Sequence, residues 1–438
     1  MTIWIILLAA IAGDVWPGFL GAGATKPTES NVALHWSPKQ GVLWQTPIDG
    51  HGQSSPVIWN DIVFVSSVDG PLKEQCIVLA YSLADGKLLW KHTIKSSDPV
   101  ENSLYVSRAA PTPVVDANRV VVFFESGDIV ALDHSGKEQW QRSISRDYGK
   151  FQNKFGLSGS LAQTDESVIV LVDDEGPSYL IAIDKASGST RWKQERTARR
   201  SWSSPSLIQI DSTSHVVVSS NGSVDGYDPK TGASVWTFTD VGGNTGASPI
   251  DIGQGRFFVA ASAGREGENS EMAKRSNMLM QVRREGTQWS ATPLWRTEEA
   301  SPSWASPIAH NGSAYWINNV GVVYCLDLES GKLHYKQRTK QSCWATPVGV
   351  GDRVYFFGKS GMTTVLAAGN EFKVLAENEL WDPDSIKPPA NAGSNEPTEE
   401  RRRAAAMFSG PTVYGVAVAN GKIIVRIGDR LFCVGSSS

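Results

Sequence analysis

The chain has 438 residues, of which 41% are hydrophobic and 20% are charged, and its formal net charge is −4. This balance excludes a disordered chain and provides no basic surface for nucleic acid or for an anionic membrane. With 41 Gly and 22 Pro, the composition favours many short strands joined by tight turns.

The chain begins with an apolar run from Ile3 to Ala12, which is too short to cross a bilayer as a helix. Its end, Ala10-Ile11-Ala12, matches the small-residue pattern that signal peptidase cleaves. We therefore predict an export signal over residues 1–12 and an N-terminal extension over residues 13–41. No Lys or Arg precedes the apolar run, so a buried N-terminal segment is the alternative. We expect an exported protein, periplasmic or extracellular, without a transmembrane segment.

One sequence phrase then returns eight times, and each copy opens on a short apolar strand. Six copies open with Ser-Pro or Thr-Pro, and two copies lack the Pro. The eight openings are Ser55-Pro56, Thr112-Pro113, Ser160-Leu161, Ser204-Pro205, Ser248-Pro249, Ser306-Pro307, Thr346-Pro347 and Gly415-Val416.

The second half of the phrase is a strand ending in Asp, a Gly turn and a strand carrying Trp. We expect each Trp to lie flat against a neighbouring repeat and each Asp to cap the backbone of its turn. The Trp residues assigned this docking role are Trp90, Trp140, Trp192 and Trp236, and the Asp residues are Asp133, Asp184, Asp228 and Asp327.

Each repeat supplies four antiparallel strands, which is the content of one propeller blade. The prediction is an all-β, eight-bladed β-propeller over residues 42–438. The last repeat, Tyr414 to Val434, contains only three strands, whereas Val42 to Pro47 precedes the first opening as an orphan strand. Pairing of the N-terminal strand with the last blade is therefore expected to close the ring and remove its exposed edge.

Two insertions interrupt the period, at about residues 265–277 and 383–403. Their charged, Gly-rich or Pro-rich composition is typical of surface loops. Such loops are able to recruit a partner, but tolerated insertions without function have the same composition.

The Ser/Thr-Pro opening and the Asp…Gly…Trp closing resemble the repeat of pyrroloquinoline quinone (PQQ)-like propellers, the quinoprotein alcohol dehydrogenase-like family, over residues 42–434. The segment from Trp16 to Gly21, WPGFLG, looks like the mature start of exported bacterial members. The resemblance implies the fold but leaves the function open. The same repeat serves PQQ alcohol dehydrogenases and the non-catalytic lipoprotein scaffold of the outer-membrane barrel assembly machine.

The resemblance to the enzymatic members implies a disulfide between adjacent cysteines, a calcium ion held by carboxylates and amides, and an Asp base. The cysteines here, Cys76, Cys325, Cys343 and Cys433, lie far apart, and Cys325 and Cys433 fit buried free thiols in apolar strands. Glu101, Asn102 and Asn244 are candidate calcium ligands, although polar residues are expected in such loops anyway. We assign no catalytic residue and no metal site.

Three tryptophans, Trp202, Trp304 and Trp344, stand three residues before the Pro of their repeats. This position leads into the innermost strand, so the rings are candidates to line a ligand funnel at the central channel. Packing between blades is the alternative role. The basic residues Arg108, Lys154, Arg199 and Arg200 lie in comparable loops and are candidates to bind anions, with solvated loop charges as the alternative.

The leading functional hypothesis is a non-enzymatic binding or scaffold protein of the cell envelope that binds a peptide or partner protein on one propeller face. A PQQ- and calcium-dependent dehydrogenase is the alternative, and a carbohydrate-binding propeller is the second alternative. No cofactor is expected under the leading hypothesis. The oligomeric state is left open.

Overall fold

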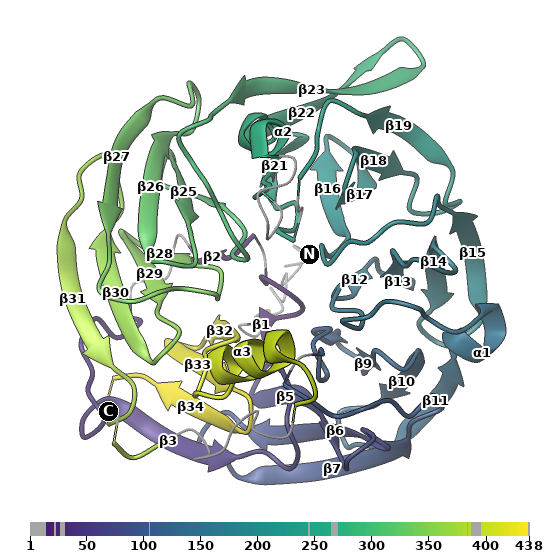
Figure 1. Ribbon diagram of the computed structural model, residues 1–438, viewed down its shortest axis with the longest axis vertical. Helices are drawn as coiled ribbons and strands as arrows, with labels where there is room; N and C mark the ends of the chain where they lie inside the picture. The colour runs from purple at the N-terminus through teal and green to yellow at the C-terminus, as the bar shows by residue number, and fades with distance from the viewer. Residues whose placement is uncertain are drawn as a thin grey trace, which may run out of the picture.

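The computed structural model describes residues 15–21, 23–26, 31–104, 106–243, 246–263, 270–382, 384–386 and 396–436. These residues form eight sheets that stand around a central axis as the blades of one ring (Figure 1). Each blade has four antiparallel strands, with the first strand nearest the axis and the last at the rim. The prediction of an all-β, eight-bladed propeller is confirmed.

The first four blades follow one another along the chain. Their strands are β4 (Val57–Trp59), β5 (Ile62–Asp69), β6 (Gln75–Ser82) and β7 (Leu88–Lys95) in blade 1; β8 (Val114–Val115), β9 (Val120–Phe123), β10 (Asp128–Leu132) and β11 (Glu138–Ser143) in blade 2; β12 (Ala162–Gln163), β13 (Ser167–Val172), β14 (Tyr179–Asp184) and β15 (Thr190–Glu195) in blade 3; and β16 (Ser206–Ile210), β17 (Thr213–Ser220), β18 (Ser223–Tyr227) and β19 (Ser234–Phe238) in blade 4.

The other four blades complete the ring. Their strands are β20 (Asp251–Gly253), β21 (Arg256–Val259), β22 (Met278–Glu285) and β23 (Gln288–Arg296) in blade 5; β24 (Ile308–His310), β25 (Ser313–Ile317), β26 (Val322–Asp327) and β27 (Leu333–Arg338) in blade 6; β28 (Val348–Val350), β29 (Arg353–Phe357), β30 (Met362–Ala367) and β31 (Val374–Glu379) in blade 7; and β32 (Gly415–Ala419), β33 (Lys422–Ile427), β34 (Arg430–Val434) and β3 (Val42–Pro47) in blade 8.

The ring closes in blade 8, where the rim strand comes from the other end of the chain. Strand β3 pairs antiparallel with β34, from Val42 opposite Val434 to Pro47 opposite Arg430. The orphan strand of the sequence therefore completes the last blade, as predicted. This pairing covers the edge that β34 would otherwise expose.

The segment ahead of β3 also enters the ring, which the prediction of a simple extension over residues 13–41 did not include. Strand β1 (Val15–Trp16) pairs with the inner strand β4, and β2 (Thr25–Lys26) pairs in parallel with the inner strand β28. Between them, the Pro17 carbonyl accepts a 2.9 Å hydrogen bond from the Val115 amide of blade 2. Residues 15–21 and 23–26 thus form an axial plug joined to blades 1, 2 and 7 (Figure 1).

The ring has two different faces. The connection face carries the loops that lead from the rim strand of one blade to the inner strand of the next, and the turn face carries the Asp…Gly turns. Helix α1 (Ile144–Tyr148) and helix α3 (Glu399–Phe408) lie in loops of the connection face, and α2 (Ser270–Arg275) lies between β21 and β22. No helix among the described residues is long and apolar enough to span a membrane.

Both insertions expected to be surface loops contain ordered structure in their described parts. Residues 270–275 form α2, and the Asn277 side chain beside it is buried and hydrogen-bonded to the Ala261 backbone. The second insertion ends in α3, whose first turn is capped by the Thr398 side chain. Burial of the Asn277 side chain in the first insertion and capping of α3 in the second therefore stabilise local structure despite the polar composition.

Successive blades are joined at the turn face by a repeated contact. A rim-strand tryptophan lies on the Gly of the next blade's turn and donates its indole N–H to a turn carbonyl. The donors Trp44, Trp90, Trp140, Trp192 and Trp295 reach the carbonyls of Leu83, His134, Lys185, Pro229 and Leu328, respectively.

The turns that receive these indoles are held by carboxylates. Asp133, Asp184, Asp228 and Asp327 each accept hydrogen bonds from backbone N–H groups of their own turns. The Gly leaves room for the ring, since a Cβ at Gly232 would lie 2.4 Å from the indole of Trp192. The turn of one blade and the indole ring of the preceding blade therefore stabilise each other across the blade boundary.

Candidate functional site

Two of the three tryptophans predicted to line a funnel meet on the connection face. The ring centroids of Trp304 and Trp344 lie 4.4 Å apart in an edge-to-face arrangement. Trp344 also contacts Phe408 of α3 at 5.2 Å, and the Lys359 ammonium lies 4.3 Å from the Trp344 ring centroid. These four residues form what we call the aromatic patch.

The aromatic patch has one open side. Trp304 is 41% exposed, whereas large aromatic side chains usually bury most of their surface. Trp344 is more enclosed because Trp304, Phe408 and Lys359 surround it. Burial lowers the pKa of Lys359 below its ordinary value. The patch therefore presents an exposed indole on a base of partly covered rings.

The third tryptophan lies elsewhere on the same face. Trp202 contacts Phe155 of the preceding connection loop at 6.1 Å, and the Lys154 ammonium lies 5.4 Å from the Phe155 ring centroid. Within the described residues, no ring contact joins Trp202 to Trp304 or Trp344. The structure therefore separates the predicted trio into a pair and a single indole.

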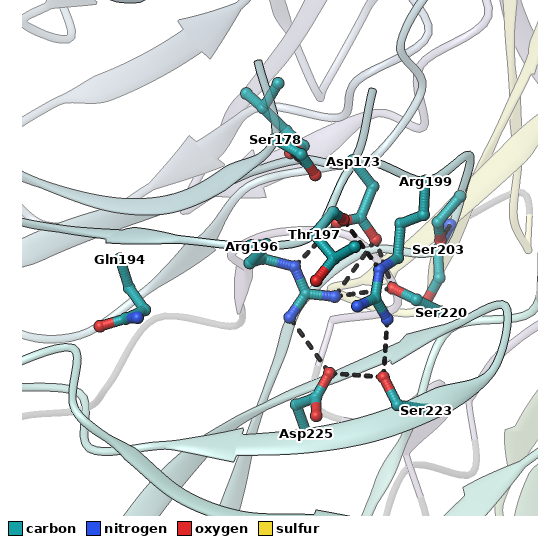
Figure 2. Close-up of polar contacts among 12 residues, drawn as sticks. Asp173, Ser178, Gln194, Arg196, Thr197, Arg199, Ser203, Ser220, Ser223 and Asp225 are labelled. Atoms are coloured by element: carbon teal, nitrogen blue, oxygen red, sulfur yellow. Dashed lines mark hydrogen bonds and ion pairs between the residues drawn. The ribbon is translucent and has the colours of Figure 1, made fainter. Parts of the chain in front are cut away.

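A buried ion-pair network lies between blades 3 and 4, where the loop that carries Trp202 begins (Figure 2). The Arg196 guanidinium contacts the carboxylate of Asp173 at 2.8 Å and that of Asp225 at 3.2 Å, and these three side chains are almost fully buried. Burial alone would lower the pKa of Arg196, but the two carboxylates outweigh it and raise that pKa. The network joins a carboxylate of blade 3 to one of blade 4 through Arg196.

The two arginines that follow Arg196 are engaged in contacts within the chain. The Arg199 guanidinium donates to the Ser223 hydroxyl at 2.7 Å (Figure 2), and Arg200 forms a 2.7 Å ion pair with Glu175. Both residues were candidates to bind anions. In the structure their guanidinium groups are thus paired with Ser223 of blade 4 and with Glu175 of blade 3, respectively.

Arg108, the fourth candidate of the predicted binding set, is buried instead of lying in a solvated loop. Only 8% of the residue is exposed, because its loop is enclosed where blades 8, 1 and 2 meet. Burial lowers the pKa of Arg108, and neighbouring Tyr414 and Glu125 act in the opposite direction. Its Nε and Nη2 atoms make no hydrogen bond to any described residue.

Two of the three candidate calcium ligands, Glu101 and Asn102, are engaged with other groups of the protein. The Glu101 carboxylate forms a 2.7 Å ion pair with the Arg401 guanidinium, and the Asn102 side-chain amide donates a hydrogen bond to the Gly70 carbonyl. Asn244 lies outside the described residues. Among the residues that the structure describes, no three His, Cys, Asp or Glu side chains converge as metal ligands.

The cysteines also differ from the arrangement in the quinoprotein enzymes. All four are free and buried, in agreement with the expectation for Cys325 and Cys433. The four separated cysteines therefore do not fit the disulfide between adjacent cysteines that the resemblance to PQQ dehydrogenases implies.

Sequence reasoning missed the residues that complete the aromatic patch. Phe408 follows an insertion, and Lys359 lies in a turn of blade 7, so neither position shares the repeat register of Trp304 and Trp344. It also missed the axial plug, although the WPGFLG segment was the visible signal. With the inner strands of blades 2 to 5, this segment lines an axial cavity of about 400 Å³.

Comparison with known proteins places these features in a wider group. The family model described as outer membrane protein assembly factor BamB matches residues 24–156, 149–293 and 282–427. A curated protein of that name from Moranella endobia (strain PCIT) is 29% identical over 180 residues, which are 41% of this chain and 40% of the relative. The matched part is thus well under two thirds of that relative's length.

Two solved structures share the fold at low sequence identity. BamB from Moraxella catarrhalis matches with a TM-score of 0.60 and 13% identity over 90% of this chain and 99% of that chain. The quinohemoprotein alcohol dehydrogenase from Comamonas testosteroni matches with a TM-score of 0.62 and 12% identity over 97% of this chain and 81% of that chain. At such identities these likenesses describe the propeller architecture alone.

Proposed function

The chain belongs to the family of outer membrane protein assembly factor BamB, and from this premise we propose that it is a non-enzymatic envelope protein that docks a partner protein on its connection face. The partner class suggested by the relatives' name is a component of outer membrane protein assembly. Export across the cytoplasmic membrane is part of the same proposal.

The observation that carries the proposal is the exposure of Trp304 on the aromatic patch. Val320, 48% exposed, lies close by, since the amide of its neighbour Asn319 donates a 3.1 Å hydrogen bond to Ser303. Exposed apolar groups that cluster on a soluble protein mark interaction surfaces, and partly exposed Trp is enriched among the residues that dominate binding energy.

The rigid support of the patch favours a docking role. The indole of Trp304 rests on Trp344, which in turn is held by Phe408 and Lys359. An anchor fixed before binding loses little conformational freedom when a partner covers it.

The test uses a photo-crosslinking amino acid at position 304 in cells, followed by identification of the crosslinked protein. Position 89 is the matched control, because Leu89 is 50% exposed but lies on the rim strand β7. We expect a specific partner at 304 and not at 89. With the purified partner, Trp304→Ala should weaken binding about tenfold or more, whereas Leu89→Ala should not.

Three results would contradict the proposal. These are equal crosslinking at both positions, unchanged affinity of the Trp304→Ala variant, and dye-linked alcohol oxidation by the purified chain after addition of PQQ and calcium. The first two would remove the connection face as the docking surface, and the third would remove the non-enzymatic assignment.

A further inference from the structure

The joint between blades 4 and 5 departs from the repeated tryptophan contact. Trp236 occupies the docking position of its repeat, but its Nε1–H donates to Nδ1 of His215 in its own blade at 3.0 Å. Its ring stacks on Phe257 of blade 5. Trp236 thus lies against the neighbouring blade, as predicted, but its N–H acceptor differs from that of the other joints because blade 5 has no Asp…Gly turn to receive the indole.

Blade 5 instead has a long rim hairpin. Strands β22 and β23 have eight and nine residues and meet at a turn without Asp, and the hairpin projects beyond the ring (Figure 1). A groove of about 670 Å³ lies between this hairpin and blade 4, and we call it the joint groove. Its volume is in the range of small-molecule binding sites.

The joint groove has a fixed hydrogen-bond donor in His215. An indole nitrogen only donates, so Nδ1 of His215 must accept, and the ring hydrogen lies on Nε2. Burial lowers the pKa of His215, which keeps the ring neutral. No described residue accepts a hydrogen bond from Nε2. His215 lines the joint groove with only 4% of the residue exposed, and we assign its Nε2–H as the donor to a ligand there.

The groove also has an acceptor in Asp228. One carboxylate oxygen of Asp228 accepts the amides of Lys230 and Thr231, while the other oxygen receives no hydrogen bond from the described residues. The equivalent carboxylate in blade 3 differs, because the second oxygen of Asp184 accepts a 2.9 Å hydrogen bond from Arg191. Asp133 in blade 2 also has a second oxygen without a hydrogen bond from the described residues, so Asp228 is distinguished by lining the joint groove beside His215.

An aromatic side chain and balanced charges complete the lining. The ring centroid of Trp289 in the hairpin lies 4.6 Å from that of His215 and 5.4 Å from the Arg284 guanidinium, and Trp289 remains partly exposed. The carboxylates of Asp211 and Asp228 are matched in number by the guanidinium groups of Arg283 and Arg284. The lining has no net charge, and it therefore favours neither an anion nor a cation.

We propose that the joint groove binds a neutral saccharide. Each sugar hydroxyl both donates and accepts, so adjacent hydroxyls satisfy the Asp228 oxygen and the His215 N–H together. The apolar face of the sugar covers the exposed part of Trp289. This site is separate from the aromatic patch, and it does not depend on the proposed partner protein.

The test is calorimetric titration of the full chain with maltotriose and with cellotriose. We expect saturable binding of at least one trisaccharide. The Asp228→Asn variant should weaken that binding about tenfold or more, since a charged acceptor is lost. Asp184→Asn is the matched control, because it alters the same turn position where the second oxygen is already occupied, and it should leave binding unchanged.

A second variant keeps the test decisive if Asp228→Asn does not fold. Trp289→Ala leaves the turn of blade 4 intact and should also weaken binding about tenfold or more. Absence of binding for both trisaccharides would overturn the proposal. So would equal losses in Asp184→Asn and Asp228→Asn, or a loss caused by Trp304→Ala but not by Trp289→Ala.

Discussion

The indole Nε1 of Trp192 in blade 3 donates a 3.0 Å hydrogen bond to the carbonyl oxygen of Pro229 in blade 4. The ring covers Gly232 of the same turn, and only 9% of Trp192 is exposed. One side chain therefore supplies both apolar burial and a directional bond across the boundary between two blades.

We expect Trp192→Ala to lower the free energy of unfolding by about 3–5 kcal/mol, through lost burial and an unfilled cavity. Chemical denaturation measures this loss. The control is Leu89→Ala, an exposed rim substitution that should change stability by roughly 0.5 kcal/mol or less. A Trp192→Ala variant as stable as this control would show that the joint does not depend on the indole.

Removal of Arg196 should leave Asp173 and Asp225 as uncompensated buried carboxylates. Arg196→Met is expected to destabilise the protein by about 3–5 kcal/mol. Arg200→Met breaks the neighbouring ion pair with Glu175. Because the Arg200 and Glu175 side chains are 49% and 41% exposed, this change should lower the free energy of unfolding by less than about 1 kcal/mol. Equal losses in the two variants, measured by urea denaturation, would contradict this account.

Stability should fall in mild acid because three histidines are buried in their neutral form. Burial lowers the pKa of His215 and His310, and burial together with Arg108 and Arg426 holds the pKa of His51 well below its ordinary value. The unfolded chain binds these protons near pH 6.5, whereas the folded chain binds them only at lower pH. The stability from keeping them neutral is therefore complete above pH 6.5 and is lost as the pH falls below it.

Below pH 6.5, the free energy of unfolding should change by about 1.4 kcal/mol per pH unit for each histidine that remains neutral in the folded state. Denaturation curves between pH 7 and pH 5 measure this slope. His51→Gln should reduce this dependence on pH by up to about 1.4 kcal/mol per pH unit, which is the contribution of one proton. A slope identical to that of the unsubstituted protein would show that His51 titrates alike in both states.

Deletion of residues 1–47 should destabilise the whole ring, because blade 8 loses β3 and exposes the edge of β34. The same deletion removes the axial plug, including the fully buried Trp16. Deletion of residues 1–12 is the control and should leave thermal unfolding unchanged. An unchanged unfolding temperature after the longer deletion would contradict the closure.

The repeat itself was sufficient to predict the number of blades, their strands and the closing pair. These features depend on local patterns, such as Asn-Gly at residues 311–312 and 420–421, where positive φ at both residues forms the expected tight turn. An orphan strand at one end and a three-stranded repeat at the other then left one pairing that covers both edges.

The surroundings of the candidate site residues were decided by the tertiary structure. Trp202 and Trp304 share one register position, yet one packs on Phe155 and the other remains exposed beside Trp344, because loops of different blades surround them. Arg108 is buried where three blades meet. The Trp236 N–H donates to His215 because blade 5 lacks an Asp…Gly turn. Periodicity determines each blade by itself, whereas contacts between blades depend on neighbours that are distant in the sequence.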